Sequence, residues 1–286
     1  GCARRVRRAG AGGLKTASWL LAVLLALLLL ATACTAASTK STRARPSAAA
    51  STPAATTTPT PTLTPTPTTA RTTSPRPQPT TPPPLSAKAR AAGLHDIHAI
   101  VPDAIVDLRY ATPDNFVGVR LYPRDARCLV HTSMTRGLDV AARVLRRAGY
   151  LLVFWDCYRP HPVQVRMFQI VPNANWVARP GPYATSHEAG RSVDVTLAYR
   201  STHERCTATR RVQGHCLLAM GTGFDNFTPR AYAFATAGVS DAAQANRATL
   251  RHAMADGGLT VYSGEWWHFD GPGALVHRPI LGAPLR

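Results

Sequence analysis

A long tract of Thr, Pro, Ala and Ser separates the first part of the chain from the rest. The tract runs from Ser38 to Pro84 and consists almost wholly of these four residue types. Such a composition cannot bury enough apolar surface to offset the entropy lost on folding, and its prolines favour an extended backbone. We therefore expect a disordered spacer at residues 35–88, which leaves residues 89–286 for one folded domain.

The residues before this tract have the order of a secretory leader. Several basic residues precede an apolar run from Trp19 to Ala31, and small residues lead to Cys34. The run is 13 residues long, whereas a helix that spans a bilayer needs about 20. Residues 1–34 are therefore predicted to be a signal peptide rather than a transmembrane helix.

The small residues before Cys34 resemble a bacterial lipobox, in which the cysteine becomes the lipidated first residue of the mature protein. On this interpretation the domain lies outside the cytoplasm, where a lipid at Cys34 anchors it to the outer face of the cell membrane. Cleavage after Ala33, with secretion of the protein, is the alternative.

The formal net charge of +18 is unevenly distributed. Residues 1–88 contain 11 Lys and Arg and no Asp or Glu, which leaves +7 for the remainder. The remainder has no basic run interleaved with aromatic residues, which is the pattern expected of a surface that binds nucleic acid. The charge therefore does not indicate nucleic acid as a partner.

Four cysteines follow the leader, and an even number in an exported chain predicts disulfides. Four cysteines permit three pairings. The pairing that closes a short loop joins Cys206 to Cys216 and leaves Cys128 with Cys157.

Apolar periodicity predicts a mixture of helices and strands, and hence the α+β class. Residues 135–149 and 242–255 repeat apolar side chains at helical spacing. Residues 192–197 alternate as a strand does, so that Asp194 lies on the face opposite the valines. Further strands are expected at residues 104–110, 150–155, 259–262 and 266–269, and a further helix at residues 163–170.

Two short segments concentrate residue types that bind metals. One contains His187 and Asp194, and the other contains Glu265 and His268. Two His and one Asp can hold Zn²⁺ and leave its fourth position to water. Glu265 precedes two tryptophans, and partial burial there would raise its pKa toward the range of a general acid/base. Glu188 and Asp270 are further candidates.

Several separated blocks of this sequence resemble the zinc D-alanyl-D-alanine dipeptidases of the vancomycin-resistance type, in peptidase family M15. The blocks are residues 107–112 (Asp-Leu-Arg-Tyr-Ala-Thr), 114–118, 155–160 (Trp-Asp-Cys-Tyr-Arg-Pro), 187–194, 221–225 (Gly-Thr-Gly-Phe-Asp) and 265–268 (Glu-Trp-Trp-His). They occur in order across most of residues 89–268. We expect a single catalytic domain with a small central antiparallel sheet flanked by helices.

The resemblance implies a role for each matching residue. His187, Asp194 and His268 would bind one zinc ion, Glu265 would be the general acid/base, and Arg159 would stabilise the oxyanion formed during attack on the peptide carbonyl. An ion pair of Arg159 with a neighbouring acid is the structural alternative.

The resemblance also implies that Ser186, Tyr110 and Asp225 bind the two ends of a dipeptide, with Asp225 near its ammonium group. Three departures from the family pattern stand out. Cys157 occupies a position that is usually Gly, and Glu188 replaces a small or polar residue that commonly follows the first ligand. The stretch at residues 200–216 is also longer than usual. A bridge across this stretch could rigidify it over the site.

The predicted activity is zinc-dependent hydrolysis of D-Ala-D-Ala in the turnover of cell-wall peptides. One alternative is a D,D-carboxypeptidase or endopeptidase that acts on longer peptidoglycan stem peptides. Another is a zinc-containing wall-binding module without turnover, although the presence of Glu265 and Arg159 argues against it.

Overall fold

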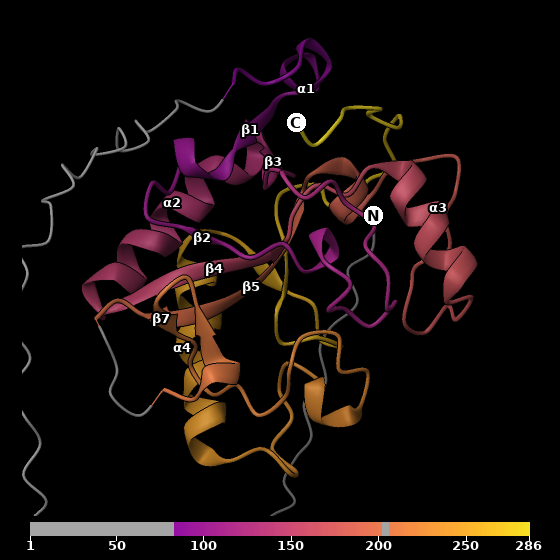
Figure 1. Ribbon diagram of the computed structural model, residues 1–286. Coiled ribbons are helices and arrows are strands. Elements are labelled where there is room, and N and C mark those ends of the chain that lie inside the picture. Colours follow the sequence, from indigo (N-terminus) through magenta and orange to yellow (C-terminus); the bar gives the residue numbers. More distant parts are fainter. Residues whose placement is uncertain (1–82, 202–205) are drawn as a thin grey trace, which may run out of the picture. The chain divides into compact units, whose positions relative to one another are not determined.

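The computed structural model of the protein describes residues 83–201 and 206–286 (Figure 1). The predicted signal peptide, the predicted lipidation site Cys34 and most of the predicted spacer lie outside these residues. Among the helices of the described part, none combines the length and the apolar character that a bilayer crossing requires.

A five-stranded sheet forms the centre of the domain, in the order β2-β4-β5-β9-β8 (Figure 1). Its strands are β2 (Ile105–Val106), β4 (Tyr150–Asp156), β5 (Ser192–Tyr199), β8 (Thr260–Val261) and β9 (His268–Asp270). Three of the neighbouring pairs are antiparallel, but β2 and β4 are parallel. The expected antiparallel sheet is therefore mixed, because the chain crosses over through a helix between β2 and β4.

The helices are α1 (Ala87–Ala91), α2 (Thr132–Arg147), α3 (His161–Ile170) and α4 (Asp241–Asp256). Helix α2 packs against β4 and α4, and it buries an apolar stripe that includes Leu138, Ala141 and Leu145. The chain leaves α2 through Gly149, whose φ of +85° favours glycine. Helix α3 lies at the other end of the domain from α2 (Figure 1).

Strands β4 and β5 form the buried centre of the sheet. Every residue of β4 after Tyr150 and every residue of β5 before Tyr199 is buried. Their register shifts between Phe154 and Asp156, so that Asp156 lies opposite Asp194. A bulge of this kind redirects side chains near the end of a strand, and it brings two carboxylates to the same end of the sheet.

Three predicted strands are shorter than expected, and the one expected at residues 259–262 consists of Thr260–Val261 alone. After β2, the backbone N–H of Asp107 still donates to Phe154, but a 3₁₀ turn then begins at Arg109. Arg109 pairs there with both Asp107 and Asp114, which favours a compact turn over an extended strand. In the last segment, residues 266 and 267 precede β9, and both tryptophans are buried in the core.

The structure contains two disulfides, Cys128–Cys157 and Cys206–Cys216. The first joins the residue before β3 (Leu129–His131) to the residue after β4. The second closes the hairpin of β6 (Arg211–Val212) and β7 (His215–Cys216), which a bridge at Leu217 connects to Ala198 of β5.

The expectation that the Cys206–Cys216 bridge lies over the site is wrong. None of the described residues of the 200–216 stretch lines the cleft that holds the predicted site residues. The hairpin attaches near the Tyr199 end of β5, whereas Asp194 lies near the other end of this strand.

Candidate active site

Three side chains that can bind a metal meet at one end of the sheet. Asp194 of β5 lies directly opposite His268 of β9, and His187 comes from the 3₁₀ turn Ser186–Ala189. Asp194 Oδ1 is 3.0 Å from His268 Nδ1 and 3.3 Å from His187 Nε2. The two imidazole nitrogens are 3.1 Å apart. Neighbouring ligands of a tetrahedral zinc ion, bound at about 2.0–2.1 Å, are about 3.3 Å apart, so the three atoms fit such an ion.

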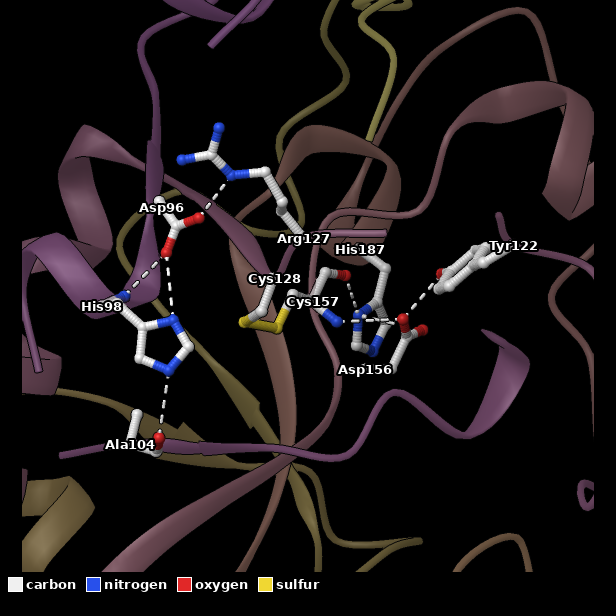
Figure 2. Close-up of a disulfide and its surroundings, with 9 residues drawn as sticks. All are labelled: Asp96, His98, Ala104, Tyr122, Arg127, Cys128, Asp156, Cys157 and His187. Atoms are coloured by element: carbon white, nitrogen blue, oxygen red, sulfur yellow. Dashed lines mark hydrogen bonds and ion pairs between the residues drawn. A yellow bond between two sulfur atoms is a disulfide. The ribbon is translucent and has the colours of Figure 1, made fainter. Parts of the chain in front are cut away.

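The second nitrogen of each imidazole is held by an acceptor. His187 Nδ1 donates to the carbonyl oxygen of Cys157 at 2.8 Å (Figure 2). His268 Nε2 donates to Asp270 Oδ1 at 3.0 Å. Because each acceptor holds one ring proton, His187 Nε2 and His268 Nδ1 are the nitrogens that face Asp194 and would bind a metal in place of a second proton. This arrangement is typical of metal-binding histidines.

The charges around the three residues favour a cation between them. Burial lowers the pKa of His268, but hydrogen bonds with Asp194 and Asp270 outweigh burial and raise this pKa to about 10. Burial raises the pKa of Asp194, but His187 and His268 hold it well below its usual range. The carboxylates therefore stay ionised and stabilise positive charge at this point.

Glu265 lies in the loop before β9 and lines the same cleft. Burial raises the pKa of its carboxyl above the usual range, and His268 partly offsets this effect. Trp266 and Trp267 are both fully buried, and Trp266 Nε1 donates to Thr222 Oγ1 at 2.7 Å. The two tryptophans thus fix the backbone next to a buried carboxyl group whose pKa is raised, as a general acid/base requires.

Arg159 follows β4 and presents a guanidinium group that is held on two sides. Its Nη2 and Nε donate to Asp156 Oδ2 at 2.6 and 3.1 Å, and its Nη1 donates to Gln164 Oε1 at 2.8 Å. Asp156 also accepts from Tyr122 Oη at 2.6 Å. The guanidinium lies 5.3 Å from the centre of the Tyr110 ring and lines the cleft. Arg159 therefore forms the ion pair that was the structural alternative, and it also lies in the cleft as its predicted catalytic role requires.

The three residues expected to bind a dipeptide also line the cleft. Tyr110 Oη donates to Asp225 Oδ2 at 2.9 Å, and Ser186 Oγ donates to Ser192 Oγ at 2.9 Å. Burial, followed by the charge of Asp194, raises the pKa of Asp225 well above its usual range. Ser186 and Asp225 have φ values of 48° and 54°, and such strained backbones occur often at functional sites.

One cleft of about 970 Å³ contains all eight residues that the sequence predicts for metal, catalysis and substrate. Aromatic side chains form a further part of its wall, among them Trp176, Phe227, Tyr232 and Tyr262. Trp176 stacks on Phe227 with 5.3 Å between ring centres. The predicted residues are Tyr110, Arg159, Ser186, His187, Asp194, Asp225, Glu265 and His268.

Sequence reasoning missed several residues that support this site. The acid expected to pair with Arg159 is Asp156, but it also accepts from Tyr122 and lies 3.7 Å from His187 Nδ1, which the sequence does not indicate. Asp270 is a further acid candidate in the sequence, but its role as the acceptor for His268 was not predicted, although strand alternation places residues 268 and 270 on one face. The role of the Cys157 carbonyl could not be predicted from the sequence, because every residue has a backbone carbonyl.

Glu188 departs from the family pattern and directly follows His187, the first candidate metal ligand. Its Oε1 lies 2.6 Å from Nδ1 of His161, the first residue of α3. Glu188 also lines the cleft, so it links the 3₁₀ turn that carries His187 to α3.

Comparisons with known proteins agree with this arrangement. The sequence profile of peptidase M15, described as D-ala-D-ala dipeptidase, matches residues 90–285. The chain is 34% identical over 188 residues to a D-alanyl-D-alanine dipeptidase of Escherichia coli K12, an alignment that covers 66% of this chain and 89% of that protein. Dipeptidases of Enterococcus faecium and Streptomyces coelicolor are each 31% identical, with 57% of this chain and 83% of each relative covered.

Proposed function

The chain belongs to the peptidase M15 family of D-Ala-D-Ala dipeptidases, as its motifs predict, and we propose that it is a zinc-dependent enzyme that hydrolyses D-Ala-D-Ala. The observation that carries this proposal is the meeting of His187, Asp194 and His268 with Glu265 and Arg159 in one cleft. A zinc ion held by the first three residues would supply a Lewis acid and lower the pKa of a water molecule.

Glu265 moves the proton in this proposal. Its carboxylate takes a proton from the attacking water and passes it to the amine that leaves when the peptide bond breaks. Burial raises the pKa of this carboxyl, which makes it a better proton acceptor than an exposed glutamate. The position of Glu265 in the cleft that contains Asp194 and His268 supports this role.

Arg159 stabilises the negative charge that develops on the carbonyl oxygen. A guanidinium group has five N–H donors, and the contacts with Asp156 and Gln164 use three of them. One N–H on each terminal nitrogen remains for the substrate. Since its partners already hold the group in place, little reorganisation is needed when the charge appears.

Asp225 and Tyr110 receive the ammonium end of the dipeptide. Burial raises the pKa of the Asp225 carboxyl despite the hydrogen bond from Tyr110 and the charge of Arg159, and an ammonium group beside it would favour the ionised form. Ser186, whose hydroxyl reaches Ser192, lies next to the first metal ligand and contacts the other end of the substrate.

The size of the cleft favours a second candidate, hydrolysis of longer stem peptides that end in D-Ala-D-Ala. A volume of about 970 Å³ is near the upper end of the roughly 300–1,000 Å³ that suits drug-sized ligands, and a dipeptide is smaller than such ligands. The half-exposed Trp176, Tyr232 and Tyr262 offer apolar surface to additional residues. A comparison of kcat/KM for D-Ala-D-Ala and for a pentapeptide with this ending separates the two, since preference for the pentapeptide would reject the dipeptidase proposal.

The acid/base role is tested with Glu265→Ala in the zinc-loaded protein. We expect kcat to fall by about 10²-fold or more, while the zinc content stays near one per chain, because the three metal ligands are intact. The matched control is Glu188→Ala, which removes a carboxyl of the same cleft that pairs with His161 and should cost less. Unchanged activity in Glu265→Ala would refute the assignment, and a wild type without turnover would favour a wall-binding module.

A further inference from the structure

A second pocket of about 490 Å³ lies beside α1 and the start of α2, and it shares no lining residue with the catalytic cleft. Three of its lining side chains are cationic, namely Lys88, Arg191 and Arg278, and His131 also faces it. None of the described residues that line the pocket is acidic. The positive charge gathered here is therefore not neutralised by the pocket itself.

The two arginines lie close to each other around one glycine. A Cβ atom placed on Gly273 would meet Arg278 Nη2 at 2.7 Å and Arg191 Nη1 at 3.7 Å. The Nε atoms of both arginines are buried and have no hydrogen-bond partner within the described part of the chain. Buried N–H groups almost always have an acceptor, so these two arginines are not fully satisfied by the described residues, although Arg191 Nη1 donates to Ser133 Oγ and to the carbonyl of Pro272.

His131 lies beside Arg191 in this pocket. Its Nδ1 is 3.0 Å from the backbone nitrogen of Ser133 and 3.1 Å from Ser133 Oγ, so either ring nitrogen can carry the proton. Its Nε2 is 3.2 Å from Nη2 of Arg191. An anion here would meet the Nη2 donor of Arg191 and, in the tautomer with the proton on Nε2, the imidazole as well.

The electrostatics of these residues agree with the geometry. Burial, followed by Arg191, Arg278 and His95, lowers the pKa of His131. Burial and then Arg278 lower the pKa of Arg191. All the charges that act on these two groups are cationic, as expected of a site that awaits an anion.

We propose that this pocket binds a phosphate group, with Arg191, Arg278 and His131 as its donors. Phosphate suits the pocket better than a carboxylate because it offers more acceptor oxygens and more negative charge to donors that approach from several sides. The pocket also lies at the N-terminal end of the 16-residue helix α2, where the helix dipole favours an anion. Ala92, Ile280 and Leu281 form an apolar wall, so an organic phosphate fits better than the free ion.

The test is isothermal titration of the full chain, treated with a chelator so that phosphate cannot bind a metal in the cleft. The probes are inorganic phosphate, glycerol 3-phosphate and acetate. We expect glycerol 3-phosphate to bind at least as tightly as inorganic phosphate, and both to bind more tightly than acetate. Tighter binding of acetate, or no binding of either phosphate, would overturn the proposal.

Matched variants identify the pocket. Arg278→Gln should weaken phosphate binding at least tenfold, whereas Arg143→Gln, on the exposed face of α2, should leave it unchanged. An equal loss in both variants would mean that only net charge matters, which contradicts a specific site. A circular dichroism spectrum like that of the wild type checks that Arg278→Gln is folded. Because no substrate is present, the result does not depend on whether the chain is a dipeptidase.

Discussion

The buried carboxylate of Asp156 connects Arg159 to Tyr122 and to the backbone of Cys157. One of its oxygens accepts from Tyr122 and from the backbone of Cys157, and the other accepts twice from Arg159. The side chain is fully buried, so these contacts are not weakened by water. Asp156 therefore positions Arg159, although it need not touch the substrate.

We predict that Asp156→Asn lowers kcat/KM by about tenfold or more, because the amide cannot hold the guanidinium by charge and leaves it free to turn. Steady-state kinetics on D-Ala-D-Ala measure the change. Asp114→Asn is the control, since Asp114 also pairs with an arginine but is exposed. Equal kinetics in the two variants would show that Asp156 does not position Arg159.

At the scale of elements, the Cys128–Cys157 disulfide ties the start of β3 to the end of β4 (Figure 2). The carbonyl of Cys157 accepts from His187 Nδ1, and its N–H donates to Asp156. The backbone that orients His187, one of the candidate metal ligands, is thus fixed covalently. The Cys206–Cys216 disulfide has no such link, since the described residues of its hairpin do not reach the cleft.

This difference predicts different effects of removing the two disulfides. Cys128→Ser/Cys157→Ser should lower the free energy of unfolding by about 3–4 kcal/mol and weaken zinc binding by roughly 10-fold or more. The Cys206–Cys216 disulfide closes a shorter loop. Cys206→Ser/Cys216→Ser should therefore lower the free energy of unfolding by only about 2–3 kcal/mol, without changing the zinc affinity. Urea denaturation and a competitive zinc titration measure these values. Equal zinc affinity in both double variants would contradict the positioning role of Cys157.

At the scale of the whole molecule, we propose that the catalytic domain, residues 89–286, works outside the cytoplasm at the end of a Thr/Pro-rich spacer. The composition of residues 35–88 supports this spacer, and the lipobox-like residues before Cys34 support an anchor. A D-Ala-D-Ala hydrolase in this place would act on products of wall turnover.

A lipid anchor at Cys34 predicts that a variant without this cysteine changes its location. Cys34→Ala should move the protein from the membrane fraction to the medium, because no acyl chain is attached, and fractionation with immunoblotting shows the change. Its activity per molecule should stay at the wild-type value, because Cys34 precedes the proposed catalytic domain. A wild type that is already in the medium would favour secretion after cleavage at Ala33.

Much of the domain could be predicted from local sequence. Helix α2, helix α4 and strand β4 occur within a few residues of the predicted ranges, because apolar periodicity and terminal glycines are local signals. The residues expected to bind the metal also meet. Asp194 and His268 are paired across β5 and β9, and His187 lies in the turn that precedes β5. Of the strand expected at residues 104–110, only Ile105–Val106 forms, and a 3₁₀ turn begins at Arg109, whose ion pairs join residues on both sides of that turn.

The sequence by itself determined the α+β class, the candidate metal ligands and the family, because each depends on short motifs or on periodicity. Only the tertiary structure decided that the β2–β4 pair is parallel and that the carbonyl of Cys157 holds His187. It alone brought Arg191 and Arg278 around Gly273. These features join residues that are far apart in the chain or use backbone atoms common to every residue, so no local pattern can indicate them.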